Sequence, residues 1–317
     1  MKKDELKNML YQMILCRRFE EKAGEMYTTG KFKGFCHLYI GEEAVAVGAM
    51  SALREDDYVL ASYREHAHCL VKGSDPGAVM AELFGKKTGV SKGKGGSMHL
   101  FDSERNFLGG HAIVGGHIPI ATGVGFALKY EGKDQVVVCF FGEGSVHQGT
   151  FHESLNLASL WKLPVVFCIE NNRYGMGTSL ERASSMYELF EKARSYNMPR
   201  AHIDGMNVLK VRKIFDEAVQ RAREEKTPCL IEALTYRFKG HSMADPAHYR
   251  TKEELEKQQK RDPILVFQKT LLKDNVISKK DIENFEKEIE EKVNKAVEFA
   301  DKSEEPELEA LYEDLYV

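Results

Sequence analysis

The sequence has no apolar run approaching the ~18 residues that a membrane-spanning helix needs. Residues 1–22 carry charges at helical spacing and lack the continuous apolar block of a signal peptide. Internal repeats and low-complexity segments are also missing. We therefore expect a globular protein located in the cytoplasm, without a membrane partner.

Paired cysteines are missing too. The spacing matches neither a disulfide framework nor a zinc site, because no two cysteines stand close together in the chain. Two of them lie inside apolar runs that are typical of buried strands, so a role in packing is favoured. The six cysteines are Cys16, Cys36, Cys69, Cys139, Cys168 and Cys229.

Positive charge is not in excess either: the net charge is -4 and the pI is about 6.3. The chain thus lacks the excess of positive charge that is typical of nucleic-acid-binding proteins, and small polar ligands or protein partners are favoured. A length of 317 residues is enough for one large α/β domain. We expect a single domain over 1–317, with an N-terminal helical layer (about 1–55) and a charged, helical C-terminal extension (about 251–317).

The middle of the chain alternates between two patterns. Short continuous apolar runs predict buried strands, and longer segments with apolar residues at helical spacing predict helices. Strands that are apolar throughout, separated by helices, indicate an α/β fold with a parallel sheet covered by helices on both faces. The predicted strands are 135–141, 164–170 and 228–238; the predicted helices are 4–28, one starting near 42, 150–162, 185–197, 207–226, 251–272 and 278–302.

A glycine-rich segment, GKKTGVSKGKGGSMH at 85–99, interrupts the region between 57 and 120. It contains too much glycine for a regular helix or strand, and it is too embedded to be a linker. We expect a loop whose bare backbone approaches a ligand.

Polar residues follow two of the predicted strands where each strand ends. Gly142-Glu143-Gly144 follows the first strand, and Asn171-Asn172 follows the second. Asn172 stands 29 residues after Glu143. That spacing suits one turn, one helix and one strand, so the carboxylate and the amide meet at the carboxyl edge of the sheet. A few oxygen ligands with open positions suit Mg²⁺, which keeps phosphate oxygens in its octahedron. The pattern predicts a diphosphate ligand bridged by a metal.

Gly142-Glu143-Gly144 followed by Asn171-Asn172 resembles the fingerprint of thiamine-diphosphate enzymes, and further segments extend the resemblance over nearly the whole chain. The chain resembles alpha subunits of the thiamine-diphosphate-dependent 2-oxo-acid dehydrogenases, of the pyruvate and acetoin types, and this implies the thiamine-diphosphate-binding fold. The segments are FCHLYIGEEA at 35–44, SYREHAH at 62–68, GKGGSMH at 93–99, AIVGGHIPIATGVGFA at 112–127, GTFHESLNLASLWKLPV at 149–165, ENNRYGMGTSLERAS at 170–184 and YRFKGHSMADPAHYRTKEE at 236–254.

The resemblance implies a set of cofactor ligands. The side chains of Glu143 and Asn172 and the carbonyl oxygen of Tyr174 correspond to the family's Mg²⁺ ligands, although the family usually has Asp where this chain has Glu143. The longer side chain still offers an oxygen but requires a different distance between backbone and metal. Thiamine diphosphate contacts are expected from Tyr63, Arg64, His241, Gly144 and Ser145 at the diphosphate and from the backbone of Ala112 and Val114 at the aminopyrimidine.

Two histidines, His37 and His241, resemble the family's catalytic histidines. Ser242 matches a position that is phosphorylated in animal pyruvate dehydrogenases, but an ordinary loop serine is the favoured interpretation. We expect most of the other histidines to be structural: His66, His68, His99, His111, His117, His147 and His152.

The implied enzyme is a pyruvate dehydrogenase (acetyl-transferring), an oxidoreductase that decarboxylates pyruvate and passes the acetyl group to a lipoyl-bearing acyltransferase core. In this family a beta subunit supplies the glutamate that activates the cofactor, so this chain is expected to form half of each site in an α₂β₂ heterotetramer. An acetoin dehydrogenase alpha subunit is the close alternative. A noncatalytic assembly subunit is the remote one, because a pure scaffold has no need for Arg64 or the acid and amide pair.

Overall fold

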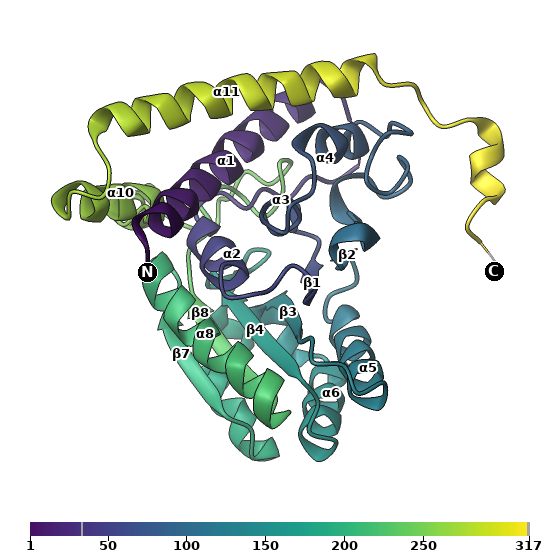
Figure 1. Cartoon of the computed structure of the whole chain (residues 1–317), viewed down its shortest axis with the longest axis vertical. Coiled ribbons are helices and arrows are strands. Elements are labelled where there is room, and N and C mark those ends of the chain that lie inside the picture. Colours follow the sequence, from purple (N-terminus) through teal and green to yellow (C-terminus); the bar gives the residue numbers. More distant parts are fainter. Residues whose placement is uncertain (33, 316–317) are drawn as a thin grey trace.

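A six-stranded parallel sheet forms the centre of the protein (Figure 1). The computed structural model describes residues 1–32 and 34–315. The strands lie in the order β2-β1-β3-β4-β8-β7, and a separate two-stranded hairpin, β5-β6, follows β4 in the chain. The strands are β1 (Tyr58–Ser62), β2 (Phe107–His111), β3 (Val137–Gly142), β4 (Val165–Asn171), β5 (Tyr174–Gly175), β6 (Thr178–Ser179), β7 (Arg200–Asp204) and β8 (Cys229–Leu234).

The three predicted strands are confirmed as β3, β4 and β8, which are neighbours at the middle of the sheet. Sequence reasoning missed β1, β2 and β7. β2 contains two glycines, and β7 reads Arg-Ala-His-Ile-Asp, so neither has the continuous apolar run of a central strand. Both lie at the edges of the sheet, where burial on only one side tolerates such residues.

Alternate residues of the central strands enter two different cores. Val138 and Phe140 pack with the cluster that includes helices α2 and α8, whereas Val137 and Phe141 pack with the cluster that includes α5 and α6. Helices therefore cover both faces, which confirms the predicted α/β architecture. These helices are α2 (Glu43–Met50), α5 (His117–Tyr130), α6 (Gly149–Leu160) and α8 (Val208–Glu225).

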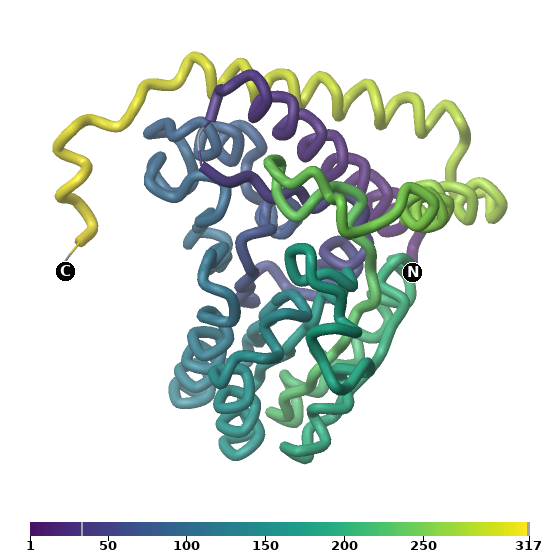
Figure 2. Tube along the Cα trace, turned by 180° about the vertical axis from the view of Figure 1, so that it is seen from behind, coloured from purple at the N-terminus to yellow at the C-terminus, as the bar shows by residue number. Residues whose placement is uncertain are grey.

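An outer helical layer lies across one side of the molecule (Figures 1 and 2). The long helix α11 packs against α1 and α4, and α1 presents Leu10, Met13 and Ile14 to the core. A capping box at Ser278 begins α11. The remaining helices are α1 (Lys3–Thr28), α3 (His66–Val71), α4 (Pro76–Leu83), α7 (Leu180–Ala183), α9 (Lys252–Gln259), α10 (Pro263–Lys273) and α11 (Lys279–Lys302), with 3₁₀ turns η1 (Gly96–Met98), η2 (Ser103–Arg105), η3 (Glu143–His147), η4 (Leu189–Tyr196) and η5 (Leu308–Tyr312).

Two helix predictions were wrong in detail. The segment 251–272 is divided into α9 and α10, because Asp262 caps a new helix with Pro263 in its first turn. The segment 185–197 forms only the 3₁₀ turn η4, which starts at Leu189 after four residues that are not helical. Among the described residues, no helix is both long and apolar enough to span a membrane.

The glycine-rich segment forms the predicted loop, and four of its backbone N–H groups bind a buried carboxylate of the protein itself. The Oε2 atom of Glu82 accepts hydrogen bonds from the N–H groups of Ser91 and Gly93, each at 2.8 Å. Its Oε1 atom accepts from Gly95 at 2.7 Å and from Gly96 at 3.1 Å. Glycine is required here because a Cβ at Gly95 would lie 2.0 Å from the carbonyl oxygen of His99.

We predict that Glu82→Gln destabilises the fold by about 3 kcal/mol, because an amide brings its own N–H donors against backbone donors that have no other acceptor. Urea unfolding measures this change. Glu104→Gln is the matched control, since the side chain of Glu104 is 88% exposed and its loss is expected to cost less than about 0.5 kcal/mol. Equal stability of the two variants would show that the carboxylate does not organise the loop.

Candidate active site

The carboxyl ends of β1 and β3 lie where the order of the strands reverses. From β1 the chain moves to β2 on one side, and it later returns to β3 on the other side of β1. Open parallel sheets bind ligands at such a switch point, because the loops after the two strands diverge and leave a crevice. The loop after β1 begins with Tyr63 and Arg64, and the turn after β3 begins with Glu143.

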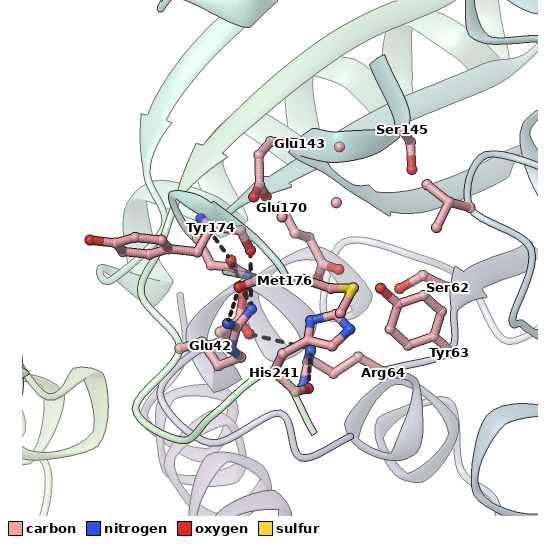
Figure 3. A pocket seen from close by; sticks show the side chains of 16 residues that line it. Glu42, Ser62, Tyr63, Arg64, Glu143, Ser145, Glu170, Tyr174, Met176 and His241 are labelled. Atoms are coloured by element: carbon pink, nitrogen blue, oxygen red, sulfur yellow. Dashed lines mark hydrogen bonds and ion pairs between the residues drawn. The ribbon is translucent and has the colours of Figure 1, made fainter. Parts of the chain in front are cut away.

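A cavity of about 250 Å³ lies at this point of the sheet (Figure 3). The figure shows Glu143 and Ser145 entering it from one wall, and Tyr63 and His241 from the facing wall. Gly142 aligns with Glu170 of the adjacent strand β4, so both strands end at the same level. The predicted residues that line the cavity are Tyr63, Arg64, Val114, Glu143, Gly144, Ser145, Asn172, Tyr174 and His241.

Two predicted residues do not line the cavity. The ring of His37 lies behind it, with its centroid 4.5 Å from that of Tyr63 and 5.1 Å from that of His241. Ala112 is half-buried and precedes the lining residue Val114 by two positions.

Sequence reasoning missed several residues of the cavity, because no chemical pattern singled them out. All six stand inside segments that carried the family resemblance, and two of them, Ser62 and Glu170, also stand at strand ends, which was the available signal. The missed lining residues are Glu42, Ser62, Glu170, Gly175, Met176 and Arg237.

The guanidinium of Arg237 connects the loop after β4 to a second loop over 239–250. Its Nη1 atom donates to Asn172 Oδ1 at 3.3 Å and to the Tyr174 carbonyl oxygen at 3.2 Å. Its Nη2 atom donates to the Met176 carbonyl oxygen at 3.3 Å and to the Tyr249 hydroxyl at 2.8 Å. Arg237 is 2% exposed, so these bonds hold the oxygens of Asn172 and Tyr174 in place from the protein side.

The carboxylate of Asp245 holds the loop that carries His241. Its Oδ2 atom accepts from the N–H of His241 at 2.6 Å and from the Tyr249 hydroxyl at 2.8 Å, and its Oδ1 atom accepts from the N–H of Ala247 at 2.8 Å. Partial burial raises the pKa of Asp245, but the N–H donors of His241 and Ala247 outweigh burial and keep the pKa below its usual value. The loop and the position of His241 thus depend on this ionised carboxylate.

A second buried guanidinium, that of Arg64, supports the opposite wall. It donates to the carbonyl oxygens of Leu38 and His241, each at 2.8 Å. Burial and the nearby charge of Arg237 lower the pKa of Arg64, although a guanidinium remains charged at neutral pH. The cavity therefore contains two fixed positive charges.

Burial favours the neutral form of Glu42, Glu143, His37 and His241. It raises the pKa of Glu143, and it raises the pKa of Glu42 to about 8 despite the opposing charge of Arg64. Burial and the two arginines lower the pKa of His241 to about 3, and burial with Arg64 lowers the pKa of His37 to about 2. Because the arginines keep their charge while the carboxyl groups resist ionisation, the cavity attracts anions.

Buried polar atoms without partners point into this region. Among the described residues, Glu143 Oε1, Glu42 Oε2 and the Nδ1 atoms of His37 and His241 are buried and have no hydrogen-bond partner. Such groups cost free energy unless a ligand satisfies them. A Cβ added at Gly144 would meet nothing within 4 Å, so the backbone there is open to a close approach from the cavity.

Beneath the cavity, Glu170 joins buried polar groups from two other segments. Its Oε1 atom accepts from the Tyr39 hydroxyl and lies 3.0 Å from Nε2 of His68. His66 and His117 are likewise bonded within the protein, to Glu20 and to the Phe140 carbonyl oxygen. These contacts account for three of the histidines that were expected to be structural.

Known proteins resemble this chain along almost its full length. Residues 11–309 match the profile of the family described as Dehydrogenase E1 component. The chain is 46% identical over 315 residues to "Pyruvate dehydrogenase E1 component subunit alpha" of Rhizobium meliloti (strain 1021), covering 99% of this chain and 90% of the relative. It is 45% identical to the protein of that name from Rickettsia bellii (strain RML369-C), with 99% and 97% covered. It is 46% identical to "Pyruvate dehydrogenase E1 component subunit alpha-3, chloroplastic" of Arabidopsis thaliana, with 99% and 75% covered.

Removal of the Asp245 carboxylate is expected to loosen the loop that carries His241. In Asp245→Ala, amide hydrogen exchange at His241 and Ala247 should accelerate by at least about tenfold, because two charge-assisted bonds are lost. Exchange mass spectrometry of the 238–250 region measures this effect. Asp216→Ala, which removes an exposed partner of Arg212 on α8, should leave exchange in that loop unchanged; equal rates in both variants would contradict the role of Asp245.

Proposed function

The chain belongs to the Dehydrogenase E1 component family, and we propose that it is the alpha subunit of a pyruvate dehydrogenase (acetyl-transferring). Enzymes of this family depend on thiamine diphosphate. The observation that carries the proposal is the cavity at the switch point, where the oxygens of Glu143, Asn172 and Tyr174 meet the buried charge of Arg64. The three relatives described above carry the pyruvate name, so the acetoin alternative is not favoured. A noncatalytic assembly subunit has no need for this set of buried groups.

The diphosphate of the cofactor is bound by the positive wall of the cavity. Arg64 supplies a planar guanidinium suited to phosphate oxygens, and Tyr63 and His241 supply hydrogen-bond donors beside it. On the opposite wall, Gly144 and Ser145 line the cavity, and a Cβ added at Gly144 would meet nothing within 4 Å, so we assign their N–H groups to the phosphate oxygens. Binding an anion here offsets the two buried guanidiniums, whose charge is otherwise only partly compensated.

A Mg²⁺ ion fits the oxygens beside the diphosphate. Glu143 Oε1 is a buried oxygen with no partner among the described residues. The Tyr174 carbonyl oxygen accepts from Arg237 and keeps a second lone pair. Asn172 Oδ1 accepts from Arg237 at 3.3 Å and from the N–H of Tyr174 at 3.4 Å, so a metal would replace the longer of these two bonds. One carboxylate, one amide and one carbonyl leave positions for phosphate oxygens and water, as Mg²⁺ prefers. No cluster of three His, Cys, Asp or Glu side chains suited to a metal occurs in the described part of the chain, and this mixed set requires none.

Bound thiamine diphosphate supplies the nucleophilic carbon and the electron sink for decarboxylation. The residues of this chain would position the cofactor through the diphosphate, and we assign the backbone of Ala112 and Val114 to the aminopyrimidine, since Val114 lines the cavity. The lowered pKa values of His37 and His241 favour neutral rings at physiological pH, so each ring has one N–H donor and one acceptor nitrogen. His241 lines the cavity and would face the substrate, whereas His37 would act through its contacts with Tyr63 and His241. The two histidine rings pack edge to face, and this contact restricts the orientation of each ring.

The surface next to the cavity favours an α₂β₂ assembly in which a beta subunit completes each site. Alpha subunits of this family pair in general with a beta subunit and an acyltransferase core. Next to the lining residue Val114, Ile113 is 76% exposed, and Ile120 and Phe126 of α5 are each 46% exposed. An apolar surface at the rim of a half-formed site suits a permanent subunit contact. The lipoyl-bearing acyltransferase core as acceptor, and a cytoplasmic location, belong to the same proposal.

Removal of the Glu143 carboxylate is expected to weaken Mg²⁺-dependent cofactor binding strongly. In the complex with the beta subunit, Glu143→Ala should weaken thiamine diphosphate binding by on the order of a hundredfold, since even indirect metal contacts contribute this much. Calorimetric titration of cofactor at several Mg²⁺ concentrations measures the effect. Glu143→Asp restores a carboxylate and should bind detectably, whereas unchanged affinity in both variants would show that Glu143 does not contact the metal.

The proposed activity predicts release of carbon dioxide from pyruvate. The chain with its beta partner, thiamine diphosphate, Mg²⁺ and an artificial electron acceptor should decarboxylate pyruvate, and it should form acetaldehyde from acetoin at a rate at least about tenfold lower. The isolated chain should be inactive with both substrates. A faster reaction with acetoin would establish the alternative function, and an inactive complex that binds no cofactor would refute the enzyme assignment.

A further inference from the structure

Beyond the end of α11, the chain leaves the body of the protein (Figures 1 and 2), and its large apolar side chains are exposed. We call residues 303–315 the tail segment. It contains the short turn η5, and four large side chains in it are 61–80% exposed. They stand at positions i, i+3, i+4 and i+7: Leu308, Leu311, Tyr312 and Leu315.

This spacing places the four side chains on one face of an α-helix. In the structure, the segment forms only the five-residue 3₁₀ turn η5, which begins with the bond from the N–H of Ala310 to the carbonyl oxygen of Glu307 at 3.0 Å and ends with the bond from the N–H of Glu313 to the carbonyl oxygen of Ala310 at 3.4 Å. A short segment of this kind gains helical structure when its apolar face is buried in a groove, because packing replaces the missing helix length. The pattern is that of a peptide helix with four anchors.

The tail segment contacts the glycine-rich loop near both of its ends. Near its start, Lys87 pairs with Glu304, and the N–H of Lys87 donates to the Glu304 carbonyl oxygen at 3.1 Å. Near its end, Lys92 and Lys94 pair with Asp314 at 3.0 and 2.9 Å. Exposed ion pairs such as these bind weakly, so they direct the segment without covering its apolar face.

The charge of the tail segment indicates which surface it fits. Between 303 and 315 the sequence contains six acidic residues and neither Lys nor Arg; the acids are Glu304, Glu305, Glu307, Glu309, Glu313 and Asp314. A complementary groove is apolar along its floor and basic at its rim. The two grooves along α11 carry more acidic than basic side chains, and the whole chain has a net charge of -4, so a second copy of this chain is a poor partner.

We infer that the tail segment docks as an amphipathic helix into a basic-rimmed apolar groove of the beta subunit. The inference rests on the proposed function, which supplies that partner. The position of the tail segment agrees with it: the tail lies on the side of the molecule where β2 and α5 lie (Figure 1), and α5 carries the apolar surface at the rim of the cavity. One partner that contacts both surfaces is bound more tightly than by either surface alone.

The test compares two variants in complex with the beta subunit. Leu311→Ser/Tyr312→Ser removes the centre of the apolar face, and Glu309→Ser/Glu313→Ser changes two residues of the same segment that lie outside it. The first variant should raise the dissociation constant between alpha and beta subunits by at least about tenfold. The control should change it by no more than about threefold, and 0.5 M NaCl should weaken binding of the unmodified chain. Sedimentation velocity over a concentration series measures all three effects.

Two outcomes would overturn the inference. If the unmodified chain assembles with the beta subunit and the Leu311→Ser/Tyr312→Ser variant assembles equally well, the tail segment is not an anchor, while the proposed function stands. If a photo-crosslinking residue at position 308 reacts with the alpha chain instead of the beta subunit, the partner is wrong. Failure of the unmodified chain to bind the beta subunit at all would refute the assembly itself. The thermal unfolding of the isolated variants should match that of the unmodified chain, which separates docking from folding.

Discussion

Parallel strand direction is the constraint on which the site depends. Six parallel strands bring all their carboxyl ends to one edge of the sheet, and the reversal of strand order between β1 and β3 opens a crevice there. Groups that are far apart in the chain, such as Arg64 and Glu143, meet in this crevice because each stands one or two residues beyond its strand. The apolar strands below bury their side chains in two cores and keep the edge rigid.

Burial of charge is the consequence of building a site in this crevice. Arg64 and Arg237 are almost fully buried, and their bonds go largely to carbonyl oxygens, which compensate a positive charge only in part. The same burial raises the pKa of Glu42 and Glu143 and lowers the pKa of the nearby histidines. Two buried positive charges that are compensated only in part favour a bound anion, and the proposed metal diphosphate would supply one. The protein thus prepares electrostatic complementarity before the cofactor binds.

The glycine-rich loop connects internal stability to the outer surface. Its backbone surrounds the carboxylate of Glu82, which gives it one conformation despite its many glycines. Its lysines then meet the acids of the tail segment. The loop thus joins an internal carboxylate to the exposed C-terminal segment of the same chain.

The sequence alone determined the central architecture and much of the site. Continuous apolar runs identified β3, β4 and β8, since such runs are stable only between two helical layers. The strand-end position of Glu143 and Asn172 predicted that they lie close together, and the family resemblance added Tyr63, Arg64 and His241, which the structure places around the same cavity.

Tertiary structure alone decided the rest. The edge strands β2 and β7 have no apolar signature, because pairing with a neighbour stabilises them more than their own side chains do. Arg237 and Glu42 reach the cavity only because the folded chain brings distant loops together. The glycine-rich loop surrounds Glu82 because a buried carboxylate requires hydrogen-bond donors, and the backbone N–H groups of this loop supply them.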